Sequence, residues 1–170
     1  REGSLSGSVL YFVNQVADLL KDDFPDLTIT TLAYIETFQP PKNIRPRENV
    51  GIWLATDSHI WQYPYRFIEE TEKFKSAFDA WRAIGVRPYI WDYTFGDNGN
   101  WQKPVPNLEV VYHNFRFLMD RGIGGVFFQG NYTTPGTSRG ALMAWIEAQL
   151  LWNPELPLDA LVRDRSEEHT

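Results

Sequence analysis

Acidic residues that follow strand-forming segments are the side chains of this sequence best suited to chemistry. Asp92 stands near the end of the run Val86–Phe95, and Glu36 and Asp57 follow two earlier apolar runs. Hydrolysis of a glycosidic bond uses two carboxyl groups, one that protonates the leaving oxygen and one that serves as base or nucleophile. These three carboxylates are the candidate catalytic residues, and a structural ion pair, a turn or a helix cap is the alternative role.

The residues around these acids would suit a carbohydrate. Aromatic rings stack on the apolar faces of sugars, and amide or imidazole groups hydrogen-bond to their hydroxyls. The candidate substrate-binding residues are Trp91, Tyr93, Trp61, His59, Trp101, Gln129 and Asn131. Core packing is the alternative for the aromatic residues, and capping of the turn at Gly130 is the alternative for the two amides. Trp81 and Trp145, by contrast, lie at helical spacing and are expected in the core.

Strands and amphipathic helices alternate along the chain, which is typical of a parallel α/β protein with its chemistry at the carboxyl ends of the strands. Strands are predicted over 28–34, 50–54, 86–95 and 125–129, and helices over 9–20, 67–81, 108–118 and 138–151, with a helical turn over 158–162. Asn107 is expected to cap the third helix. No helix is predicted between the first two strands. Four strands with their helices make up about half of a (β/α)8 barrel, which needs roughly 250 residues. An open doubly wound sheet is the alternative fold.

Composition argues against several functions. The net charge of −6 and the lack of a Lys/Arg-rich run make nucleic acid an unexpected partner. There is no cysteine, and the three histidines lack metal-binding spacing, so we predict no disulfide, metal or cofactor. No run of about 18 apolar residues is present, so no membrane span is expected. The sequence does not begin with a signal peptide. It does not identify the compartment, and a secreted or periplasmic location of a longer parent protein is one option.

Several ordered motifs identify a family. They are Ser6-Gly7-Ser8 with Tyr11–Ala17, Thr31–Tyr34 with Pro40-Pro41, Arg45–Val50, Tyr89–Tyr93, Gly125–Tyr132 and Leu150–Pro154. Together they resemble the domain of unknown function DUF4838, a family similar to the (β/α)8 α-glucuronidases of glycoside hydrolase family 67. The resemblance implies that residues 1–164 form the C-terminal half of such a barrel, in a protein acting on glycosidic bonds. A non-catalytic glycan-binding barrel, or a structural domain of a polysaccharide-degrading protein, is the alternative.

Two features depart from the pattern of that family. Its members usually carry an upstream half barrel that is not in this sequence, so the chain alone is expected to be inactive. Phe128 stands where the family pattern has an acidic residue, which puts catalysis in doubt. Separately, residues 165–170 resemble a translated sequencing adapter and are expected to lie outside the domain, without regular structure.

Overall fold

A computed structural model of the chain describes residues 2–56, 71–94, 107–130 and 140–167. Its strands are β1 (Ile29–Ala33), β2 (Val50–Ala55), β3 (Tyr89–Tyr93) and β4 (Gly125–Gln129). Its α-helices are α1 (Ser6–Leu20), α3 (Glu72–Ala83), α4 (Leu108–Asp120), α5 (Gly140–Trp152) and α6 (Leu158–Glu167). Each predicted strand and helix is therefore present. The ends differ by a few residues from those predicted, and the predicted ends at 67–70, 95 and 138–139 lie outside the described residues.

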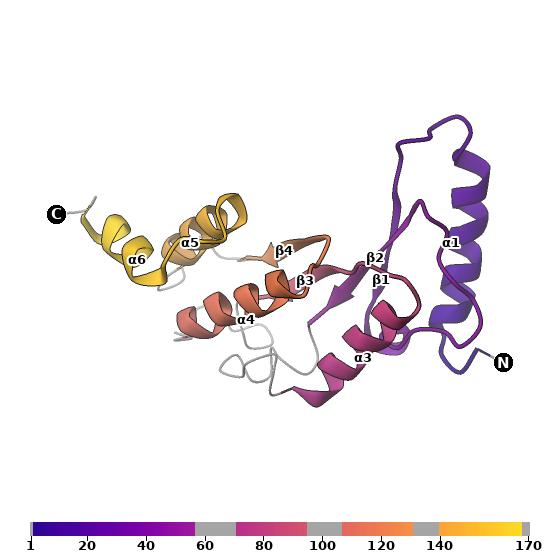
Figure 1. Cartoon of the computed structure of the whole chain (residues 1–170), viewed down its shortest axis with the longest axis horizontal. Coiled ribbons are helices and arrows are strands. Elements are labelled where there is room, and N and C mark those ends of the chain that lie inside the picture. Colours follow the sequence, from indigo (N-terminus) through magenta and orange to yellow (C-terminus); the bar gives the residue numbers. More distant parts are fainter. Residues whose placement is uncertain (1, 57–70, 95–106, 131–139, 168–170) are drawn as a thin grey trace.

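The four strands form one parallel sheet in the order β1-β2-β3-β4 (Figure 1). The register pairs Leu54 of β2 with Ile90 of β3, and Asp92 of β3 with Phe128 of β4. Strands that follow one another in the chain are neighbours in the sheet, as in a (β/α)8 barrel, whereas a doubly wound sheet reverses its strand order. The fold is α/β and has the arrangement of half of a (β/α)8 barrel, as predicted.

The connection between β1 and β2 contains no α-helix, which the sequence also predicts. Its only helical element is η1 (Ile35–Thr37), a single 3-10 turn, and the Tyr34 N–H donates to the Thr37 hydroxyl at 3.0 Å. The next residue, Phe38, is buried, and its carbonyl accepts a hydrogen bond from the Trp81 indole at 2.8 Å. Trp81 of α3 therefore fixes this loop against the sheet, where a crossover helix would otherwise pack.

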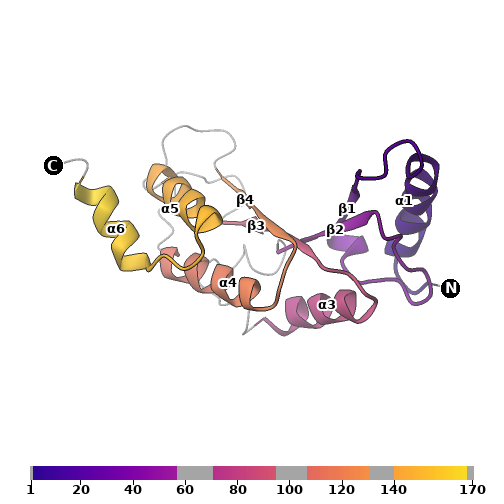
Figure 2. The same cartoon turned by 45° about the horizontal axis from the view of Figure 1, so that its top comes forward.

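The described helices cover one face of the sheet. Figure 2 shows α1, α3, α4 and α5 following one another from one side of the sheet to the other. Ile52, Leu54 and Ile90 point into the core beneath them, each at most 1% exposed. Trp81 is part of this core, and Trp145 packs half-buried against a second cluster beneath α5 and α6. Because side chains alternate along a strand, the residues between these positions face the opposite side.

That opposite side, called the inner face below because it would line the interior of a closed barrel, is aromatic. Trp53 lies against Tyr89 with ring centroids 5.0 Å apart, and Trp91 meets Phe127 at 4.5 Å. A glycine makes room for the first pair, since a Cβ on Gly51 would lie 3.2 Å from Cε2 of Tyr89. Phe127 remains 44% exposed, because none of the described helices covers this side.

Two local predictions are wrong. Asn107 precedes α4 but makes no side-chain cap, because its Nδ2 donates instead to the Thr94 carbonyl at 2.8 Å. Helix α6 continues to Glu167, so residues 165–167 are helical rather than without regular structure. The physical reason is that Leu161 of α6 is buried against α5, and this tertiary contact stabilises the whole helix.

Candidate functional site

The candidate site lies at the carboxyl edge of the sheet, where parallel α/β folds place their chemistry. The predicted site residues within the described part of the chain are Glu36, Trp91, Asp92, Tyr93 and Gln129. The predicted residues outside the described part are Asp57, His59, Trp61, Trp101 and Asn131.

Asp92 is at the carboxyl end of β3 as predicted, but it faces the helices. It follows the alternation of Ile90, whose side chain lies in the helix-covered core. Its Oδ1 accepts a hydrogen bond from the Thr56 hydroxyl at 2.6 Å, and the residue is 4% exposed. The same Thr56 oxygen accepts the backbone N–H of Tyr93 at 3.3 Å. Asp92 and Thr56 therefore tie the ends of β2 and β3 together on the side away from the inner face.

Burial raises the pKa of Asp92 above its ordinary value, because a carboxylate removed from water loses much of its solvation. The hydrogen bonds of Asp92 with the Thr56 hydroxyl and with the Tyr93 backbone stabilise the charged form and lower its pKa in part. The balance favours the neutral acid more than in water. A group with this environment can hold or donate a proton.

Glu36 is exposed and lies in η1, directly after β1. Its backbone carbonyl accepts a hydrogen bond from the Ser4 hydroxyl at 3.3 Å, which fixes the turn against the start of α1. Strand β2 separates β1 from β3, so the two strand ends are about 10 Å apart at the usual strand spacing. Among the described residues, no hydrogen bond or ion pair joins Glu36 to Asp92: Glu36 is exposed, whereas the Asp92 carboxyl group is buried and bonded to Thr56.

The carboxyl group that interacts electrostatically with Asp92 is Glu147 of α5, which sequence reasoning missed. Glu147 is 5% exposed, and its Oε1 has no hydrogen-bond partner among the described residues. Burial is the main effect that raises the pKa of Glu147 to about 8, and the charge of Asp92 adds to it. The neighbouring Thr94 side chain opposes both effects and lowers the pKa in part. Glu147 is therefore mostly neutral at pH 7.

One signal in the sequence could have identified Glu147. Helix α5 is apolar on all sides, and Glu147 is its only charged residue. A lone acid in such a helix is costly to bury and needs a reason. Helical periodicity does not predict the burial of Glu147, because a helix without a polar face does not indicate which of its residues point inward.

Trp91 and Gln129, both predicted to bind substrate, are in contact on the inner face. The Trp91 indole Nε1 donates to Oε1 of Gln129 at 2.9 Å, and the indole ring packs against Phe127. Tyr93 is opposite Gln129 in the register and is half-buried. An aromatic surface with a fixed amide beside it thus forms the last layer of the inner face. Its chemistry combines an apolar plane with hydrogen-bonding groups.

Phe128 occupies the position where the family resemblance implies an acidic residue. It is opposite Asp92 in the register, so the two side chains share the helix-covered face. The Phe128 ring packs against Phe115 of α4, with centroids 5.8 Å apart. The position is therefore apolar and supplies no second carboxylate next to Asp92.

Two further kinds of site were sought among the described residues, metal clusters and membrane-spanning helices. No group of three or more His, Cys, Asp or Glu side chains among them could hold a metal ion. None of the helices described is both long and apolar enough to cross a membrane.

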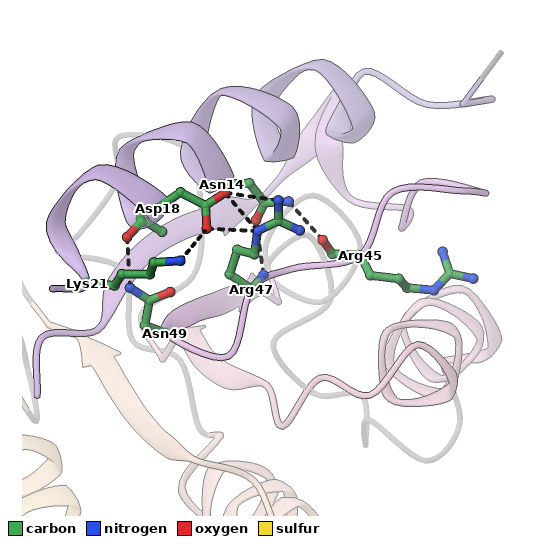
Figure 3. Close-up of polar contacts among 7 residues, drawn as sticks. Asn14, Asp18, Lys21, Arg45, Arg47 and Asn49 are labelled. Atoms are coloured by element: carbon green, nitrogen blue, oxygen red, sulfur yellow. Dashed lines mark hydrogen bonds and ion pairs between the residues drawn. The ribbon is translucent and has the colours of Figure 1, made fainter. Parts of the chain in front are cut away.

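A groove of about 610 Å³ lies at the opposite, amino edge of the sheet, between the end of α1 and the loops that precede β1 and β2. Beside it, Arg47 binds Asp18 through Nε at 3.0 Å and Nη2 at 2.9 Å (Figure 3). Asn14 bridges the same loop, donating to the Arg45 carbonyl at 2.8 Å and accepting the Arg47 N–H at 3.1 Å. Because this edge of a barrel sheet serves stability, we interpret the network as structural.

Replacing Asn14 with alanine should destabilise the protein by about 1–3 kcal/mol, since it leaves a backbone carbonyl and a backbone N–H of the loop without their partner. Asn14 is buried, whereas its neighbour Gln15 is exposed. Urea unfolding of Asn14→Ala, compared with Gln15→Ala as control, measures the difference. Equal free energies of unfolding for the two variants would show that the bridge does not stabilise the fold.

These observations define a class of protein: a parallel α/β domain with the sheet of a half barrel and with polar and aromatic residues gathered at its carboxyl edge. The model of the family described as Domain of unknown function (DUF4838) matches residues 1–168. The chain belongs to this family, which confirms the resemblance of its motifs to DUF4838. No curated protein and no solved structure matches the chain significantly.

Proposed function

We propose that the domain binds carbohydrate at the carboxyl edge of its sheet, on the inner face. The observation that supports this most directly is the contact between Trp91 and Gln129, in which the amide oxygen holds the indole N–H at 2.9 Å. A sugar ring offers an apolar face and a rim of hydroxyls, and an indole ring beside an amide complements both. The remaining hydrogen-bonding capacity of the Gln129 amide is suited to a hydroxyl.

Hydrolysis of an α-linked glucuronic acid is the second candidate. The family resemblance implies it, and Glu36 and Asp57 directly follow β1 and the end of β2. Asp92 supports it less than the sequence analysis expected, because its side chain faces the helices and its partner there is Thr56. In this proposal the nucleophile or base comes from Asp57 or from a residue outside this sequence, and Trp91 and Gln129 orient the sugar.

Trp91→Ala in the full-length protein should weaken binding of oligosaccharides that carry an α-linked glucuronic acid by about 10-fold or more, which corresponds to the loss of one aromatic binding residue. Gln129→Ala should weaken it less, because the ring remains. Trp152→Ala is the control, since Trp152 is 90% exposed at the end of α5. Isothermal titration calorimetry gives the three dissociation constants, and urea unfolding checks that each variant is folded.

Unchanged affinity in both Trp91→Ala and Gln129→Ala would rule out the inner face as the binding surface. The same oligosaccharides, followed by release of free glucuronic acid over many hours, distinguish the two candidates. Turnover that disappears in Asp57→Asn would establish hydrolysis. Binding without turnover would establish a carbohydrate-binding domain.

A further inference from the structure

Helix α1 carries an apolar stripe on its outer flank, formed by side chains that are spaced alternately four and three residues apart. The stripe consists of Leu5, Val9, Phe12, Val16 and Leu19. Leu5, Phe12 and Leu19 are 59%, 67% and 79% exposed. More than half of the exposed large apolar side chains in the described part of the chain lie between Leu5 and Leu27. A concentration of apolar surface in one place is the usual mark of an interaction site.

The contacts of α1 with the rest of the domain use the other sides of the helix. Leu10, Val13 and Ala17 pack in the core against the sheet. Asn14 and Asp18 hold the loop before β2, and at roughly 100° per residue they lie on the flank opposite the stripe (Figure 3). Helix α1 stands at one end of the row of helices in Figures 1 and 2, and none of the described helices covers the stripe.

The charge pattern of α1 indicates what kind of partner the stripe fits. Asp18 is the only charged residue between Ser6 and Leu20, and it is paired with Arg47. A helix that lies on an anionic membrane presents Lys and Arg beside its apolar residues, so α1 does not match a membrane surface. An uncharged stripe with alternating spacings of four and three is instead the pattern through which two helices pack side by side.

The order of the residues along the stripe matches a second copy of the same chain. The stripe reads Leu, Val, Phe, Val, Leu in both directions, with Phe12 at its centre. In a contact with twofold symmetry the same patch meets itself, so a stripe of this order is complementary to its own reverse. Two antiparallel α1 helices place Leu5 of one copy against Leu19 of the other. They place Val9 against Val16 in the same way, and each helix N-terminus lies beside the oppositely charged C-terminus of the other helix.

We propose that the protein forms a twofold-symmetric dimer through antiparallel pairing of its α1 helices, with Phe12 on the symmetry axis. One helix from each copy makes a small interface, so we expect a weak dimer with a dissociation constant on the order of 1–100 µM. The pairing uses neither the inner face nor the Trp91–Gln129 contact. The inference is therefore independent of the proposed carbohydrate binding.

Sedimentation equilibrium of the full chain, from about 1 to about 200 µM, measures the dissociation constant. Phe12→Lys should weaken the dimer by about 100-fold or more, because it removes the central ring and brings two like charges together on the axis. Phe12 is 67% exposed, so this variant should remain folded, which circular dichroism checks. Met119→Lys is the control, since it replaces an exposed apolar residue of α4 and should leave the dissociation constant unchanged.

Disulfide cross-linking tests the direction of the helices, because the chain has no cysteine of its own. Phe12→Cys should cross-link to itself across the axis. A mixture of Val9→Cys and Val16→Cys should give the mixed dimer, whereas parallel helices would link each variant to itself and overturn the antiparallel arrangement. A chain that stays monomeric over the whole concentration range, or a dimer that Phe12→Lys leaves intact, overturns the inference.

Discussion

Glu147→Gln should raise the free energy of unfolding by about 4 kcal/mol at pH 8 and leave it nearly unchanged at pH 4.5. The wild-type carboxyl is buried beside Asp92, and its pKa rises from the ordinary 4.5 to about 8 on folding. A glutamine has nearly the same shape and no charge, so it keeps the packing and removes only the ionisation.

The sign follows from proton binding in the two states. Between pH 4.5 and pH 8 the folded protein holds a proton on Glu147 that the unfolded chain has released, so the stability of the wild type falls as the pH rises through this window. The slope is about 1.4 kcal/mol for each pH unit. Above pH 8 both states are ionised, and the loss stays constant. The raised pKa of Asp92 contributes with the same sign.

Urea unfolding at several pH values from 4.5 to 9 measures this dependence. The control is Glu109→Gln, which removes the same charge from an exposed position of α4 and should follow the wild-type curve. Parallel curves for Glu147→Gln and the wild type would mean that Glu147 is already ionised in the folded protein at neutral pH.

Trp81→Ala should cost about 3–5 kcal/mol of folding free energy, the range for removing a buried aromatic side chain. Trp81 is 2% exposed and is the largest of the fully buried side chains described. It packs in the core with Phe78 and Ile90, and its indole holds the Phe38 carbonyl of the β1–β2 connection. The variant therefore loses core packing and also leaves a buried carbonyl without its donor.

The matched control is Trp152→Ala, because Trp152 is 90% exposed and should cost less than about 0.5 kcal/mol. Chemical denaturation of the two variants, monitored by far-UV circular dichroism, gives the comparison. Because the β1–β2 connection has no crossover helix, we also expect Trp81→Ala to increase amide hydrogen exchange around Phe38. A cost for Trp81→Ala close to that of Trp152→Ala would show that the loop and α3 are not coupled through this side chain.

The sequence by itself determined the order of the elements and the position of the candidate site along the chain. Hydrophobic periodicity, glycines and prolines act locally, so they predicted the alternation of strands and helices and the β1–β2 connection without a helix. The same local signals placed Asp92, Trp91 and Gln129 at the carboxyl ends of β3 and β4. The aromatic residues near these positions predicted carbohydrate as the ligand.

Only the tertiary structure decided which side of the sheet each of these residues faces. Alternation along a strand separates Asp92 from Trp91, but it does not indicate which of the two sides the helices cover. The helices cover the side of Ile90 and Asp92, so the predicted catalytic acid is buried against Thr56, and Trp91 and Gln129 meet on the other side. Glu147 joined the site for the same reason. Its apolar helix gives no facing direction, and packing against the strand ends places the one charged residue of that helix beside Asp92.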